Sequence, residues 1–98
     1  MEKKGLFANL LKRDRKAVAL SYEKGDSAPK VVASGNGYIA DKILDTAMEH
    51  NVPIHEDKEL AETLSKIQIG DSIPPELYEV VAEILVFVQD MDRLKEKI

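Results

Sequence analysis

The sequence predicts an α/β domain: a small mixed β-sheet of about three strands with one βαβ crossover, surrounded by three to four helices. Three observations predict this fold. Two β-rich runs are separated by turn-forming residues, apolar residues recur every fourth position after a pair of glycines, and a long apolar stripe follows near the end of the chain. A chain of 98 residues suits one domain, which buries about 60–65% of its unfolded surface.

The first two strands are expected at Lys16–Tyr22 and Lys30–Ala33. Both runs are rich in residues that favour extended backbone, and the first contains four consecutive apolar residues. The segment between them, EKGDSAP, holds the Gly, Asp, Ser and Pro residues that favour turns. Two strands joined by a loop are therefore the expected local structure.

A helix is expected from Gly37 to His50, because apolar residues recur there every fourth position. Asn51 suits its C-terminal end, since asparagine tolerates the left-handed conformation. Val52–Ile54 is predicted to be a third strand, which the crossover places parallel to the strand at Lys30–Ala33 and beside it.

Two further helices are predicted in the second half of the chain. Asp57 is positioned to cap the first of them. Pro75 suits the first position of the last helix, where its missing N–H removes no hydrogen bond. The apolar stripe of this last helix consists of Leu77, Val81, Ile84, Leu85 and Val88.

Residues 1–15 are predicted to form a basic amphipathic leader ahead of a domain that spans residues 16–98. Residues 1–16 hold six basic and two acidic residues, a net charge of +4, so the remainder carries −8. The apolar residues of the leader, Leu6, Phe7, Leu10 and Leu11, would form one stripe on a helix. Such a helix could lie on a membrane surface, occupy a partner's groove or pack on its own domain.

Composition limits the function further. The acidic body disfavours nucleic acid as its partner. The chain has no cysteine, which excludes disulfides, thiolate nucleophiles and cysteine-ligated zinc. The longest apolar run, Ile84–Val88, is far shorter than the roughly 20 residues that span a bilayer, and the start of the chain lacks the apolar segment of a signal peptide. A soluble, cytoplasmic protein is expected.

Eight short motifs occur in order between Ala17 and Val88: AVAL-x-Y, APKVVA-x-G, IA-x-x-I, VPI-x-E, LA-x-x-L, IG-x-x-IP, ELY and VAE-x-L-x-FV. Together they resemble the cytoplasmic domain of the FlhB/YscU/SpaS family, the substrate-specificity switch of flagellar and type III secretion export. The resemblance implies a cytoplasmic protein-binding module at the inner face of a membrane export apparatus. Its partners would be export-apparatus proteins or export substrates.

In that family a membrane-embedded half and one more strand precede the first of these motifs. Neither is apparent in residues 1–15, because FANLLKRDR is not β-branched and does not alternate. The chain is therefore predicted to be a stand-alone relative whose sheet lacks a strand. The resulting open edge would allow pairing with a second copy of the chain.

The resemblance also implies a site of self-cleavage. Family members carry Asn-Pro-Thr-His before the first motif, and the Asn side-chain amide attacks its own backbone carbonyl, forming a succinimide and breaking the bond to Pro. Aligning the motif places Lys12, Arg13, Asp14 and Arg15 at these four positions, and none of them matches. Because Lys12 has no side-chain amide, we predict that the chain does not cleave itself there.

The family's proposed docking patch for export substrates corresponds to Ala28 and Pro29 of the loop and to Ala82 and Leu85 of the last helix. Small exposed apolar patches often mark partner sites. The other interpretation is that Ala82 and Leu85 simply pack, because the stripe of their helix must be buried somewhere.

Two other patterns resemble sites. Gly35–Ala40 matches the G-x-G-x-x-A turn of dinucleotide-binding folds, but the chain offers one βαβ unit, and a strand-to-helix turn explains the glycines equally. His50 and His55 complete no metal-ligand spacing. We expect no catalytic residue, metal or cofactor, and therefore a non-enzymatic binding module. The alternatives are a nucleotide-binding domain that uses Gly35 and Gly37, and a homodimeric membrane-surface protein organised by the basic leader.

Overall fold

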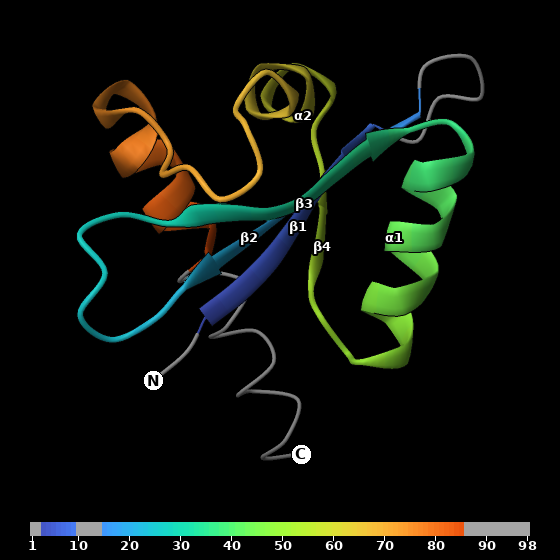
Figure 1. Cartoon of the computed structure of the whole chain (residues 1–98), viewed down its shortest axis with the longest axis horizontal. Coiled ribbons are helices and arrows are strands. Elements are labelled where there is room, and N and C mark those ends of the chain that lie inside the picture. The colour runs from blue at the N-terminus through green and yellow to red at the C-terminus, as the bar shows by residue number, and fades with distance from the viewer. Residues whose placement is uncertain (1–2, 10–14, 86–98) are drawn as a thin grey trace.

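A computed structural model of the chain describes residues 3–9 and 15–85. It confirms the predicted α/β fold. Four strands form one mixed sheet in the order β3-β2-β1-β4, and helices lie on both of its faces (Figure 1). The strands are β1 (Lys3–Asn9), β2 (Lys16–Tyr22), β3 (Lys30–Asn36) and β4 (Ile54–Glu56). The helices are α1 (Tyr38–Glu49), α2 (Lys58–Ser65) and the 3-10 turn η1 (Pro75–Leu77), which continues into helical residues 78–85.

The first strand shows that the prediction of a helical leader is wrong for residues 3–9. β1 pairs antiparallel with β2 over its whole length and parallel with β4. Leu6, Phe7 and Ala8 are all buried, because β1 has a neighbour on each side and both of its faces are covered. The centre of such a strand carries consecutive apolar residues, so it lacks the alternation that identifies a half-exposed strand. Leu10 and Leu11 lie outside the described residues.

The third predicted strand has a different partner from the expected one. β4 pairs with β1, with Leu6 opposite Ile54 and Ala8 opposite Glu56, and it makes no pair with β3. β3 and β4 still run in the same direction and are joined through α1, so the βαβ crossover is confirmed. The crossover spans two strands because β1 and β2 lie between its ends.

The expected open edge beside a missing strand does not exist, because β1 fills that position. In the described sheet the edges are β3 and β4. The start of β3 is covered by the loop that follows α2. Val31 donates its N–H to the carbonyl of Asp71 at 3.0 Å, and the carbonyl of Val31 accepts from the N–H of Gly70 at 2.7 Å.

Apolar side chains form a separate cluster on each face of the sheet. The cluster against α2 and residues 78–85 is built from large side chains: Phe7, Val18, Leu20, Val31, Leu60, Leu64, Ile73, Val81 and Leu85, with Ala28. The cluster against α1 consists mostly of small ones: Leu6, Ala8, Ala17, Ala40, Leu44 and Ala47. These small residues allow α1 to approach the sheet closely.

The local signals at the helix ends are confirmed. The Asp57 carboxylate accepts a hydrogen bond from the N–H of Leu60 at 3.0 Å and so caps α2. Asn51 has a φ of 57°, the left-handed conformation expected just after a helix. Pro75 lies in the first turn of η1. Within residues 3–9 and 15–85, no helix is long and apolar enough to cross a membrane.

Candidate functional site

The four residues of the predicted docking patch lie in different environments. Ala28 and Leu85 are only 2% and 3% exposed and pack in the same apolar cluster. Pro29 is also buried, and its carbonyl accepts a hydrogen bond from the N–H of Ile73 at 3.0 Å. Ala82 is exposed. The structure therefore brings the loop and the last helix together, but only Ala82 of this set has an exposed side chain.

Residues 78–85 carry further exposed apolar side chains that the sequence analysis did not single out. Tyr78 precedes Ala82 by one helical turn and lies on the same side of the helix, and Val80 is also exposed. Successive residues of a helix are about 100° apart, so Val80 projects from nearly the opposite side to Tyr78 and Ala82. We call Tyr78 and Ala82 the helix surface. Val80 also borders a shallow hollow of about 260 Å³ whose other lining residues are Asp57, Glu59, Leu60 and Thr63.

Arg15 is the one residue of the four predicted cleavage-site positions that the structure describes; Lys12, Arg13 and Asp14 lie outside the described residues. Its carbonyl accepts the N–H of Gly37 at 2.9 Å, and its guanidinium forms an ion pair with the carboxylate of Asp41. Arg15 therefore connects the start of β2 to the first turn of α1.

The two glycines of the G-x-G-x-x-A pattern have structural roles. Gly37 is the N-cap of α1 and has a φ of 57°, which glycine adopts without strain. At Gly35, a Cβ atom would overlap the side chain of Ile39, so the absence of a side chain allows α1 to fold back against β3. Together the two residues make the turn from strand to helix.

The two histidines have separate surroundings. His50 caps the C-terminal end of α1, with its N–H bonded to the carbonyl of Thr46 at 3.1 Å. His55 is in β4, where its ring lies edge-on to Phe7 with 5.9 Å between centroids and its Nε2 is 3.9 Å from Asp57 Oδ2. Among the described residues no group of three or more His, Asp or Glu side chains is placed to hold a metal ion.

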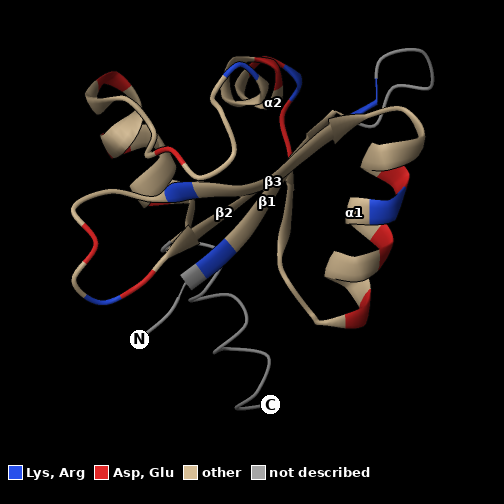
Figure 2. Ribbon diagram, viewed as in Figure 1, with Lys and Arg blue, Asp and Glu red and all other residues tan. Residues whose placement is uncertain are grey.

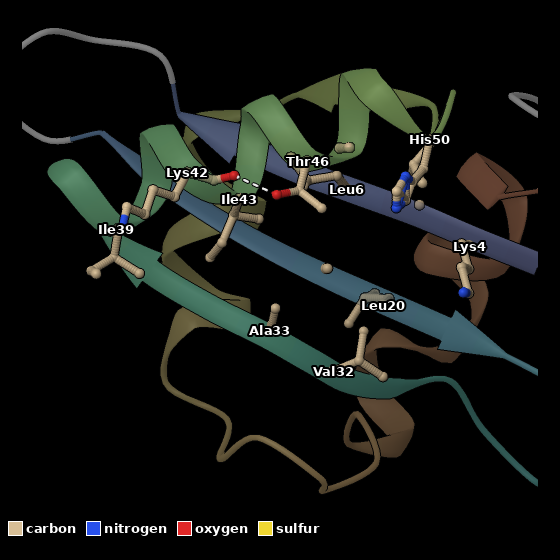
Figure 3. A pocket seen from close by; sticks show the side chains of 14 residues that line it. Lys4, Leu6, Leu20, Val32, Ala33, Ile39, Lys42, Ile43, Thr46 and His50 are labelled. Atoms are coloured by element: carbon tan, nitrogen blue, oxygen red, sulfur yellow. Dashed lines mark hydrogen bonds between the residues drawn. The ribbon is translucent and has the colours of Figure 1, made fainter.

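The structure also contains a groove that the sequence analysis did not predict. It has a volume of about 390 Å³ and lies between α1 and the sheet (Figure 3). Its residues come from three strands, from α1 and from the segment after α1, so no local pattern in the sequence marks them as neighbours.

The mixed four-stranded sheet with helices on both faces defines an α/β domain of the same fold as the cytoplasmic domain of FlhB. Comparison with known sequences makes the assignment specific. The chain matches the family described as FlhB HrpN YscU SpaS over residues 14–88, and it belongs to this family.

Solved structures and sequence relatives agree with this assignment. The cytoplasmic domain of FlhB from Shewanella putrefaciens superimposes with a TM-score of 0.87 and 27% identity, covering 97% of this chain and 76% of that one. The EscU C-terminal domain gives a TM-score of 0.80 at 26% identity, covering 88% and 78% of the two chains.

Among sequences, the chain is 48% identical over 79 residues to the uncharacterized protein YlqH of Bacillus subtilis, covering 80% of this chain and 85% of YlqH. It is 46% identical over 79 residues to the flagellar biosynthetic protein FlhB of Salmonella typhimurium, covering 79% of this chain and 21% of that protein. The chain thus spans about a fifth of the length of the FlhB proteins it matches.

Proposed function

We propose that this chain is a non-enzymatic protein-binding domain that acts as an adaptor or regulator of protein export. It works in the cytoplasm, at the inner face of a membrane export apparatus, and binds export-apparatus proteins or export substrates. The observation that carries the proposal is the likeness to the cytoplasmic domain of FlhB, which extends over 97% of this chain.

The helix surface is the part of the structure best suited to such binding. Val81 and Leu85 are buried in the main apolar cluster and hold residues 78–85 against the sheet. Tyr78 and Ala82 are therefore presented together on a helix that is already ordered. Exposed apolar side chains on a fixed element support partner binding, because little side-chain or backbone freedom is lost on association.

The proposed mode of action does not include self-cleavage. At the four positions where the family carries Asn-Pro-Thr-His, this chain has Lys12, Arg13, Asp14 and Arg15. Succinimide formation needs the side-chain amide of Asn, and a lysine side chain offers none. The domain therefore acts through binding rather than through a change of specificity that follows cleavage.

A capture experiment tests the proposal. The purified chain is immobilised and incubated with lysate of the source organism, and retained proteins are identified by mass spectrometry. The test variant is Ala82→Glu, which places a carboxylate on the helix surface without touching the core. The matched control is Met48→Glu, which adds the same group at an exposed position of α1.

We expect the parent chain and Met48→Glu to retain export-apparatus proteins or export substrates, and Ala82→Glu to lose most of them. Circular dichroism is used to show that all three proteins are folded. Retention by none of the three would contradict the proposed function. Retention by all three would leave the function intact and remove the helix surface from it.

A further inference from the structure

The groove beside α1 has an apolar floor that the fold leaves partly uncovered. The small-residue cluster brings one part of α1 tightly onto the sheet, but the face of β2 and β3 continues beyond the helix. Val32 and Ile39, which both line the groove, are 51% and 50% exposed. Val32 and Ile39 line one continuous apolar groove, and contiguous exposed apolar surface often marks a binding site, so this groove is a candidate site.

A β-bulge in the floor enlarges the apolar surface. The pairing of β2 with β3 shifts register between Ala19 and Leu20, so that Val31 is opposite Leu20 and Ala33 is opposite Ala19. Val32 is the extra residue, and both Val32 and Ala33 face the groove, although neighbouring residues of a regular strand face opposite sides (Figure 3). Bulges commonly redirect side chains in this way next to binding sites.

The ends of the groove are basic. Lys42 lies near Ile39 at one end, with its Nζ 4.9 Å from the centre of the Tyr38 ring, and Lys4 and His50 lie at the other end (Figure 3). None of the described residues that line the groove is acidic. This lining contrasts with the chain as a whole, which has a net charge of −4, and with the acidic residues that lie on either side of Lys42 along α1 (Figure 2).

We propose that this groove binds a short segment of another protein that carries apolar side chains flanked on both sides by carboxylates. The apolar side chains would cover Val32, Ala33 and Ile39, and the flanking carboxylates would lie near Lys42 at one end and Lys4 at the other. A volume of about 390 Å³ is at the lower end of the range for specific sites and accommodates a few side chains.

The arrangement favours a peptide segment over a lipid-like anion. A fatty acid has one charged end, so its tail would have to lie against the basic group at the opposite end of the groove. A segment with acids on both sides of an apolar centre complements both ends at once. The inference rests on the proposed function as a protein-binding domain, but it concerns a surface distinct from the helix surface.

Binding of defined peptides tests the inference. The probe is a fluorescein-labelled peptide with Val-Leu-Val between two pairs of acidic residues, measured by fluorescence anisotropy with the whole chain. Two comparison peptides replace the centre with Ser-Ser-Ser or the acidic pairs with lysines. We expect the probe to bind about tenfold more tightly than either comparison peptide, and more weakly as salt is raised.

Variants locate the binding. Lys42→Glu and Val32→Glu change one end and the floor of the groove at exposed positions, and we expect each to weaken the probe about fivefold. Lys58→Glu makes the same charge change as Lys42→Glu at an exposed position on α2, against the other face of the sheet, and should bind the probe like the parent.

Several outcomes overturn the inference. These are equal binding of the three peptides, equal weakening by Lys58→Glu and Lys42→Glu, and displacement of the probe by decanoate at lower concentrations than by unlabelled peptide. The test is separate from that of the proposed function. Capture of export partners without peptide binding would contradict the role of the groove and support the proposed function. Peptide binding without such capture would support the groove and contradict the proposed function.

Discussion

Ile39 lies directly against Gly35, and a Cβ atom at position 35 would overlap the isoleucine side chain. Gly35 is the residue opposite Ala17 in the sheet, and Ile39 is in the first turn of α1. The contact therefore fixes how closely α1 folds back on the sheet. It also explains why position 35, the first position of the G-x-G-x-x-A pattern, is a glycine. The groove beside α1 depends on the same contact, because Ile39 forms one of its ends.

We predict that Gly35→Ala destabilises the chain by about 1–3 kcal/mol, the usual cost of adding a methyl group where there is no space. The φ of Gly35 is not in the left-handed region, so alanine would otherwise suit this strand position. Urea unfolding measures the change. Adding Ile39→Ala to Gly35→Ala should recover part of the loss, and a double variant that loses the full sum of the single effects would contradict the contact.

Gly5 has the corresponding relationship to Leu85 on the other face of the sheet, where a Cβ atom would overlap the leucine side chain. We predict that Gly5→Ala lowers the free energy of unfolding by about 1–3 kcal/mol. Leu85→Ala in the same chain should make the alanine at position 5 tolerable, although Leu85→Ala alone leaves a cavity. A neutral or stabilising Gly5→Ala would contradict the predicted overlap and show that the terminal methyl of Leu85 moves aside.

The parts of the fold that were predictable are those determined by local chemistry. The turn residues between β2 and β3, Asp57 as a cap, Asn51 after α1 and Pro75 in η1 each act within a few residues of their position in the sequence. The fold class followed from these signals together with the change from strand to helix periodicity. Boundaries were less well predicted: β3 extends to Asn36, three residues beyond the expected end.

The position of β1 could not be predicted from periodicity, because a central strand with two covered faces carries consecutive apolar residues. Leu6, Phe7 and Ala8 are indistinguishable, as a pattern, from part of a helical stripe. The pairing of β4 with β1 was missed for the same reason. At the candidate sites, a resemblance located Ala82 and Leu85, but only tertiary packing decides that one is exposed and the other is buried.

The cap of α2 gives a prediction with a simple control. Asp57→Ala removes the acceptor for the N–H of Leu60, and we expect a loss of about 1 kcal/mol in the free energy of unfolding. Asp57→Asn keeps an oxygen acceptor and should lose only a small part of this. Thermal or urea unfolding distinguishes the two. Equal losses in both variants would assign the effect to the charge of Asp57, including its approach to His55, rather than to capping.

The last prediction concerns self-cleavage. We expect the purified chain to stay intact, with the 10.9 kDa mass of its full sequence, because Lys12 cannot form a succinimide. Replacing residues 12–15 with Asn-Pro-Thr-His supplies both the amide nucleophile and the turn-forming proline in the connection between Asn9 and Lys16, which are paired across the sheet. We expect this variant to yield fragments 1–12 and 13–98 in denaturing mass spectrometry.

The structure further predicts that the two fragments stay together under native conditions. β1 lies between β2 and β4, and the side chains of Leu6 and Phe7 are buried on opposite faces of the sheet. Release of fragment 1–12 would expose both clusters to water, so native mass spectrometry should record one species of the combined mass. The same variant with alanine in place of the new asparagine is the control and should remain uncut. Fragments that separate without denaturant would contradict the central position of β1.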